Sequence, residues 1–294
     1  MNDAGGRPIR KDGSEQVSNE VKPQFALCSI SHREKLLEYV LDLARDLGFE
    51  AIEIWGREPH INERFDENRT QAARRMIEER QLAIAALGSY VVFGPSRTRP
   101  EELVELEDVL HTARCLRCPL VRVWASDVGA AEASRTLWDR TVGEIQEACD
   151  RAQRLGIVLA ADMHDDTLTD TGESALRLLE AVERDNFRLS FHISGRPREE
   201  TPEERLEAVC SHVVHVQVQN FSSLIEGEAE RPRRASIADG LVDWYPLLER
   251  LAEGGYRGYH ALAFAACEGD GKREALAQDL HYLKSLFKLM GVAV

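Results

Sequence analysis

The stretch IVLAADMHDDTLTDT (Ile157–Thr171) begins as an apolar run and ends abruptly in polar side chains, the first of which is Asp162. Two later stretches end in the same way, because FRLSFHIS closes on His192 and VVHVQVQNF closes on Gln217 and its neighbours. A buried strand with a polar C-terminal end is typical of α/β proteins, which place their chemistry at one rim of a sheet. We therefore expect these three strands to form one site.

Apolar strands and amphipathic helices alternate along the rest of the chain. We expect eight strands, seven of them joined in sequence by helices and the last followed by an eighth helix, over residues 24–294. This count closes a parallel barrel, so we predict an α/β fold, a single-domain (β/α)8 TIM barrel. A doubly wound open sheet is the alternative. It usually has fewer strands, and no Gly-rich phosphate fingerprint follows the first strand, so we expect no nucleotide cofactor.

Local signals fix some of the element boundaries. The first strand is FALCSIS, residues 25–31, and Gly48 ends the helix that follows it. Thr201 and Glu204 have the spacing of a capping box at the start of a later helix.

A long connection without a clear element, residues 222–240, follows the seventh strand. A loop of this length is usually functional, as a lid or a binding wall, and a disordered insertion is the alternative. Arg231, Arg233 and Arg234 in this loop would suit an anionic substrate, although loop arginines are commonly only solvated.

Composition limits the partners and the compartment. The 294 residues carry a formal net charge of -14, which disfavours nucleic acid and anionic membranes as partners. Residues 1–23 are polar and are expected to form a flexible, mobile N-terminal tail. No apolar run approaches the roughly 18 residues of a membrane span, and the N-terminus lacks the apolar segment of a signal peptide. We therefore predict a cytoplasmic protein.

Six cysteines are present, and only Cys115 and Cys118 lie close together in the sequence. Their spacing is that of a zinc ribbon, but a structural zinc site needs four ligands and no second pair accompanies them. Free, mostly buried thiols are the better interpretation.

Side-chain parity identifies the candidate catalytic residues. Alternate residues of a strand share a face, so Asp162 lies with His164, His192 lies with Ser190 and Ser194, and Gln217 lies with His215 and Gln219. An inward polar cluster from three neighbouring strands is hard to explain by packing alone. We therefore predict that Asp162, His192 and His164 are catalytic and that Gln217 and Gln219 bind the substrate. Asp162 would raise the pKa of the His192 imidazole, so that the two form an acid and base pair.

Two more polar residues are expected to join this cluster. Glu53 belongs to the second strand and Arg122 to the fourth, and we predict that both bind the substrate.

The order of several segments along the chain resembles that of the xylose isomerase-like TIM barrels. This family includes sugar phosphate isomerases and epimerases and related dehydratases. The segments that carry the resemblance are FALCSIS, GFEAIEIWGREPH, PLVRVW, TLTDT, VVHVQV, IADGLVDW and GGYRGYHALAF.

The resemblance implies a divalent metal held by Glu, Asp, His and Glu from the fifth to eighth strands, where it would polarise a carbonyl or hold an enediolate. This chain departs at each position, since it carries Asp162, His192, Gln217 and Ala263 there. The lost carboxylates should collapse the affinity for hard ions. Asp162, His192 and Gln217 still form a candidate set for a metal such as Zn, Mn or Co, and a metal-free site is the alternative.

The resemblance also implies that Trp55, Arg57 and His60 line the pocket and contact polar groups of the substrate. The structural alternative is that Trp55 packs in the core and Arg57 forms a surface salt bridge.

Three hypotheses follow. The first is a sugar phosphate isomerase/epimerase-like or lyase-like enzyme that transfers protons on a polyhydroxylated or keto small molecule, with an altered metal site. The second is a metal-independent biosynthetic enzyme of the cyclase or dehydratase type. The third is a non-catalytic barrel that binds a small molecule. A homodimer is compatible with all three.

Overall fold

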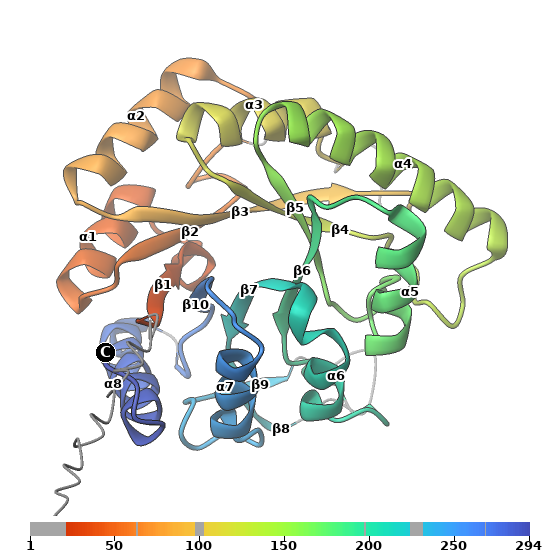
Figure 1. Ribbon diagram of the computed structural model, residues 1–294. Coiled ribbons are helices and arrows are strands. Elements are labelled where there is room, and N and C mark those ends of the chain that lie inside the picture. Colours follow the sequence, from red (N-terminus) through yellow and green to blue (C-terminus); the bar gives the residue numbers. More distant parts are fainter. Residues whose placement is uncertain (1–21, 63, 98–102, 197, 224–231, 268) are drawn as a thin grey trace, which may run out of the picture.

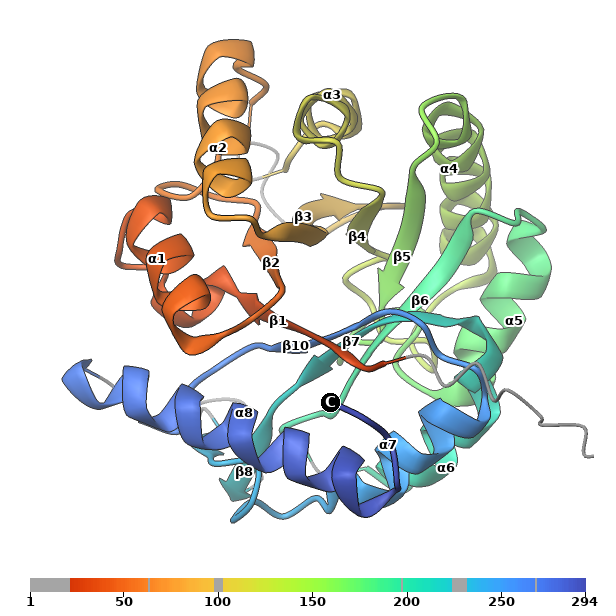
Figure 2. The same ribbon diagram turned by 60° about the vertical axis from the view of Figure 1, so that its left-hand side comes forward.

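The computed structural model describes residues 22–62, 64–97, 103–196, 198–223, 232–267 and 269–294. The predicted tail lies almost entirely outside this part of the chain, so its mobility stays a prediction. Eight parallel strands close into a barrel, in the order β1-β10-β7-β6-β5-β4-β3-β2. Eight α-helices surround the strands (Figures 1 and 2). The predicted TIM barrel is confirmed.

The barrel strands are short and end near a common rim. Their bounds are β1 (Gln24–Cys28), β2 (Ala51–Trp55), β3 (Ala83–Val92), β4 (Leu120–Trp124), β5 (Val158–Asp162), β6 (Phe187–His192), β7 (Val213–Val218) and β10 (Tyr259–Leu262). The helices are α1 (Leu37–Leu47), α2 (Glu67–Glu79), α3 (Leu106–Leu116), α4 (Arg135–Arg154), α5 (Gly172–Val182), α6 (Pro202–Val209), α7 (Trp244–Glu253) and α8 (Lys272–Leu289).

The helix signals in the sequence act as expected. Gly48 ends α1 in the left-handed conformation, with φ of 80°, which glycine adopts without a Cβ clash. Thr201 and Glu204 form the predicted capping box of α6: the Glu204 amide donates to Thr201 Oγ1 over 3.1 Å, and the Thr201 amide donates to Glu204 Oε2 over 2.9 Å.

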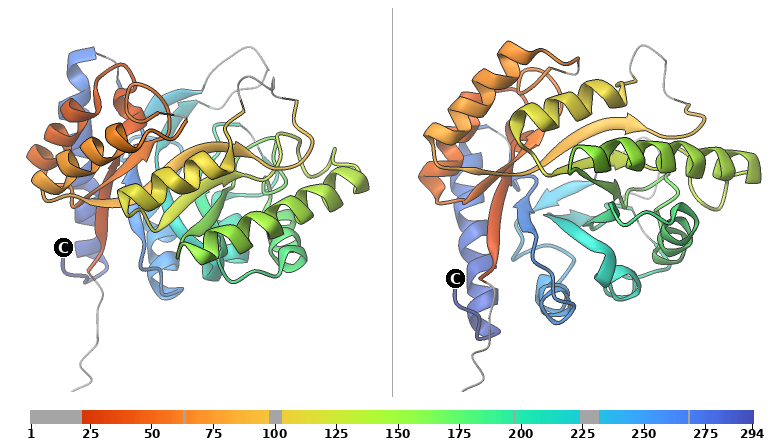
Figure 3. Two further views of the ribbon diagram at one scale, coloured as in Figure 1. Left: turned by 90° about the horizontal axis from the view of Figure 1, so that it is seen from above. Right: turned by 45° about the horizontal axis from the view of Figure 1, so that its top comes forward.

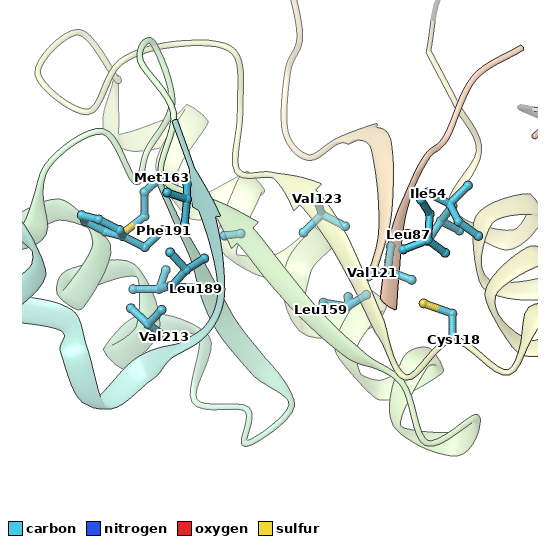
Figure 4. Close-up of a cluster of buried hydrophobic side chains, with 14 of the residues drawn as sticks. Ile54, Leu87, Cys118, Val121, Val123, Leu159, Met163, Leu189, Phe191 and Val213 are labelled. Atoms are coloured by element: carbon cyan, nitrogen blue, oxygen red, sulfur yellow. The ribbon is translucent and has the colours of Figure 1, made fainter. Parts of the chain in front are cut away.

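The core lies mainly between the strands and the helices. Outward-facing apolar side chains of adjacent strands, among them Val121, Leu159 and Leu189, are fully or almost fully buried there (Figure 4). On the inward face of the barrel, the residues near the start of the strands are small, and Ala26 and Ala51 are fully buried there. Carboxylates follow two positions later on β2 and β5, where Glu53 comes after Ala51 and Asp162 comes after Ala160, nearer the C-terminal ends of these strands.

Two predicted boundaries need correction. The first strand ends at Cys28 and Ser29–His32 form a 3-10 helix, because the Ser29 hydroxyl turns to accept from the Trp55 amide over 2.8 Å. The connection after β7 is not free of structure, since β8 (Asn220–Ser223) and β9 (Arg233–Ala235) pair as an antiparallel ribbon. Figure 3 shows this ribbon beside the end of β7. Arg231 lies outside the described residues.

Within the described part of the chain, no helix combines the length and the apolar character that crossing a membrane requires.

Candidate functional site

A cavity of about 220 Å³ opens at the C-terminal ends of the strands. Side chains from β1 to β7, from β9 and from the segments after β1, β5, β7 and β10 form its walls. They are Cys28, Ile30, Glu53, Trp55, Gly88, Ser89, Tyr90, Arg122, Trp124, Asp162, His164, His192, Gln217, Gln219, Arg234 and Phe264. The structure therefore brings together the three predicted strand ends and adds Glu53 and Arg122 to them.

The Arg122 guanidinium joins two buried carboxylates in this cavity. Its Nη1 donates to Glu53 Oε1, its Nη2 donates to Asp162 Oδ2, and its Nε donates to Asp162 Oδ1 over 3.3 Å. The other oxygen of Glu53 accepts from His215 Nε2 over 2.9 Å, and Gln217 Nε2 donates to Glu53 Oε1 over 2.8 Å. We call Glu53, Arg122 and Asp162 the ionic triad.

The arginine keeps both carboxylates ionised. Burial alone would raise the pKa of Glu53, but Arg122 and His215 hold that pKa well below its ordinary value. Burial opposes ionisation of Asp162 as well, and the adjacent Arg122 charge lowers its pKa. The triad is thus a fixed set of charges that are paired with one another.

A glycine on β3 leaves room for this arrangement. A Cβ built at Gly88 would lie 3.3 Å from Arg122 Nη1 and 3.5 Å from Glu53 Oε1. A larger side chain at this position would push the guanidinium away from Glu53.

Two histidines from β5 and β6 form another part of the wall. The ring centroids of His164 and His192 lie 5.3 Å apart, and Trp124 packs 4.7 Å from the His164 ring. His192 Nδ1 lies 3.0 Å from the Ile193 carbonyl, so it carries the proton and donates. Its Nε2 makes no hydrogen bond within the described residues, so the lone pair of this nitrogen is available to a molecule in the cavity.

The predicted pairing of Asp162 with His192 needs correction. Asp162 lies beside Ser190 in the strand register, and its carboxylate oxygens bind Arg122 instead. Burial lowers the pKa of His192 to about 4, and the nearby Asp162 charge only partly opposes this effect. His192 is therefore a neutral imidazole at pH 7, whereas the sequence had suggested a raised pKa.

The other predicted residues divide between the cavity and its supports. Gln219 lines the cavity, with Nε2 2.9 Å from the Ile193 carbonyl. Trp55 also lines it and donates from Nε1 to the Tyr90 hydroxyl over 2.8 Å. Arg57 lies outside the lining, with its guanidinium 4.1 Å from the Tyr90 ring centroid.

His60 differs from its prediction as a substrate contact. It is buried outside the cavity lining, where Nδ1 lies 2.8 Å from Ser29 Oγ and Nε2 lies 3.1 Å from the Lys35 carbonyl. Both ring nitrogens are occupied, so His60 holds the segment after β1 in place.

The residues present do not fit the divalent metal that the resemblance implies. Both oxygens of Asp162 face the Arg122 guanidinium, and the Gln217 amide donates to Glu53. Ala263, fully buried, offers no ligand. Among the described residues no three His, Cys, Asp or Glu side chains are grouped so that they could hold a metal ion. A cation of the protein itself already compensates the carboxylate that a metal would need.

His215 was expected on the inward face with Gln217, and its hydrogen bond to Glu53 agrees with this placement. Other residues of the site were missed in the sequence. Tyr90 and Trp124 contribute stacked rings with centroids 6.3 Å apart. Neither has a local motif, and only the closure of the barrel brings them to one cavity.

Comparison with known families agrees with this architecture. The family model described as "Xylose isomerase-like TIM barrel" matches residues 41–286, which is most of the chain. The chain belongs to the xylose isomerase-like TIM barrel family. The family predicted from the order of the sequence segments is thus confirmed.

Three known proteins are similar to this chain in sequence or in fold. The chain is 24% identical over 236 residues to a 3-dehydroshikimate dehydratase of Bacillus anthracis, covering 78% of this chain and 83% of that enzyme. A xylose isomerase-like TIM barrel protein from Mycobacterium smegmatis, solved in complex with magnesium, has a TM-score of 0.66 and 17% identity, with 90% and 96% of the two chains covered. A D-allulose 3-epimerase from Methylomonas sp. has a TM-score of 0.69 and 17% identity, with 90% and 98% covered. The two structures establish the shared fold.

Proposed function

We propose that this xylose isomerase-like barrel is a proton-transfer enzyme of the isomerase, epimerase or dehydratase kind. It acts on a hydroxylated keto small molecule and uses no divalent metal. The observation that carries the proposal is one cavity in which the imidazoles of His164 and His192 face a guanidinium fixed by two carboxylates. The similarity to a dehydratase supports this class of reaction.

His192 suits the role of the base. Its Nδ1 proton is held by the Ile193 carbonyl, so Nε2 presents a lone pair. Because burial keeps the ring neutral at pH 7, no proton has to leave before the residue can act. His164, whose ring lies beside it and is partly exposed, is placed to exchange protons with the substrate or with water.

Arg122 suits the role of a hydrogen-bond donor to a substrate oxygen. A guanidinium has five N–H donors, and the triad uses three of them. The remaining donors are held in a fixed direction by Glu53 and Asp162, and a preorganised donor stabilises negative charge that develops during reaction.

The chemistry follows from these roles. The base removes a proton from the carbon next to the carbonyl; the electron pair of the C–H bond forms a C=C bond, and the carbonyl π pair moves to the oxygen as an enolate. Return of a proton to the other face of the same carbon restores the carbonyl and gives epimerisation. In isomerisation the former carbonyl carbon and its oxygen each take a proton, and the neighbouring hydroxyl loses its proton as it becomes the new carbonyl. Expulsion of a β-hydroxyl, which takes a proton from the acid and leaves as water, gives dehydration.

Proton exchange in D₂O tests the proposal. The protein, dialysed against EDTA, is incubated with 3-dehydroshikimate, D-fructose, D-tagatose and D-psicose, and loss of the C–H signal next to the carbonyl is followed by NMR. We expect turnover of a member of this panel, and His192→Asn and His164→Asn should each lower its rate by about 100-fold or more. His281→Ala, at an exposed position on α8, is the matched control.

Three outcomes would contradict the proposal. Activity that EDTA removes and Zn, Mn or Co restores would assign a metal to the site. Activity that survives in the His164 and His192 variants would exclude them as the acid and base. Binding of these compounds without any exchange or turnover would favour the non-catalytic barrel.

A further inference from the structure

Arg234 is a mostly buried cation that has no carboxylate partner in the described part of the chain. It belongs to β9, and its guanidinium carbon lies 3.8 Å from the Phe264 ring centroid and 4.7 Å from that of Phe221. Its Nη1 donates to Gln219 Oε1, and no Asp or Glu among the described residues lies within ion-pair distance of it. Burial lowers its pKa to about 10, so it stays charged at pH 7.

The lack of a counter-charge among the described residues separates Arg234 from two other mostly buried arginines. The sequence has 51 acidic residues against 37 Lys and Arg, so carboxylates are in excess. Arg122 pairs with Glu53 and Asp162, and Arg198 pairs with Asp165. The buried Arg205 has no ion pair among the described residues either, but it donates to the backbone carbonyls of Met163 and Thr169. An uncompensated charge away from water lowers the stability of the folded state. A ligand anion would remove this cost.

Arg234 also lies between two cavities. Together with Ile30 and Phe264 it lines both the inner cavity and an outer one of about 740 Å³. The described charged residues of the outer cavity are four cations and one carboxylate, namely Arg33, Lys35, Arg234, Lys272 and Glu34. Although the protein as a whole is acidic, the positive charge at this entrance attracts anions locally.

We propose that Arg234 binds a carboxylate or phosphate group of the substrate, at the junction of the outer and inner cavities. The keto carbon and its hydroxylated neighbours then lie in the inner cavity beside the histidines, a placement that rests on the proposed function. The substrate class is accordingly a hydroxylated keto acid or a keto sugar phosphate. The two aromatic rings hold the guanidinium plane, while the free edge of the planar fork binds two oxygens of the anion.

Calorimetric titration with matched acid and neutral probes tests this inference without turnover. Shikimate is compared with its methyl ester, and D-fructose 6-phosphate with D-fructose, at low salt. We expect at least one anion to bind at least 10-fold more tightly than its neutral counterpart. Arg234→Gln should weaken that anion between about 10-fold and 100-fold and leave the neutral compound unchanged. The pair that responds identifies the group as carboxylate or phosphate.

Arg233→Gln is the matched control, because Arg233 is the exposed neighbour on the same strand and should change affinity less than about 3-fold. Arg234→Lys, which keeps the charge but loses the planar fork, should retain part of the affinity. Thermal melting separates binding from structure: Arg234→Gln should keep or raise the Tm, since it removes an uncompensated cation.

The inference is overturned if both anions bind no better than their neutral counterparts or do not bind at millimolar concentration. Equal effects of Arg233→Gln and Arg234→Gln, or a Tm several degrees lower in Arg234→Gln, would also overturn it. Inactivity in the exchange assay counts against the proposed function alone, because binding is measured separately. Turnover restricted to uncharged substrates counts against the anion site alone.

Discussion

For Arg122, the sequence predicted the position of the residue inside the barrel but not the residues with which it pairs. Strand parity correctly placed Glu53, Arg122 and Asp162 inside the barrel. The pairing was not predictable, because the arginine is 69 and 40 residues from its two carboxylates and no local pattern joins them. Asp162 was expected to act on His192, but a guanidinium on the other neighbouring strand is the stronger partner for a carboxylate.

The protonation state of His192 can be measured without a substrate. Because burial lowers its pKa to about 4, the imidazole should stay neutral, with the proton on Nδ1, from pH 8 down to about pH 5. Long-range ¹H–¹⁵N correlation spectra over pH 3.5–8 report both the tautomer and the midpoint. His192→Asn assigns the signal by removing it. A midpoint near 6.5, or a proton on Nε2, would exclude the neutral base described above.

Whole elements were predicted better than their ends. Eight apolar runs gave the eight barrel strands, because burial of a parallel strand on both faces leaves a continuous hydrophobic signal. The ribbon of β8 and β9 was missed, since β9 has only three residues, two of them arginines, and its partner β8 has only four. Thus Arg234 could be seen in the sequence, but its burial between aromatic rings could not.

Glycine positions offer a test at the level of the strands. The Gly56 amide, directly after the end of β2, donates to the carbonyl of Gly88 within β3 over 2.9 Å, and a Cβ at Gly56 would lie 2.5 Å from that oxygen. Gly56→Ala should therefore push the two segments apart and lower the free energy of unfolding by about 1–3 kcal/mol.

Gly143→Ala is the matched control for this change. Gly143 lies inside α4, and its Cβ would meet nothing within 4 Å, so the substitution should raise stability by up to about 1 kcal/mol. Urea denaturation measures both variants. Equal effects of the two substitutions would show that β2 and β3 are not in close contact at this point.

Several histidines are buried in the folded molecule, and burial disfavours their protonated, charged form. Burial lowers the pKa values of His32, His192 and His260 from 6.5 to about 4. Between these values the unfolded chain binds more protons than the folded one, so stability falls as the pH falls from 6.5 to 4. Burial raises the pKa of Asp279 to about 6, which has the opposite sign and offsets part of the loss.

We therefore expect the free energy of unfolding to drop by on the order of 3 kcal/mol between pH 7 and pH 5, as measured by urea denaturation. His260→Phe should make this dependence shallower. His260 packs among Phe25, Tyr256 and Phe287, and its Nε2 is buried without a hydrogen bond among the described residues. The variant should lose no stability at pH 7. A pH profile identical to that of the wild type would show that His260 does not titrate on unfolding.

The pairing of β1 with β10 closes the barrel between residues more than 230 positions apart, as in Phe25 beside His260. During synthesis the first strand must therefore wait, with one edge open, until β10 has left the ribosome. The nascent protein is exposed to strand-to-strand aggregation for that whole interval. Its yield in a cell should depend on chaperones and on the rate of translation more than its final stability would suggest.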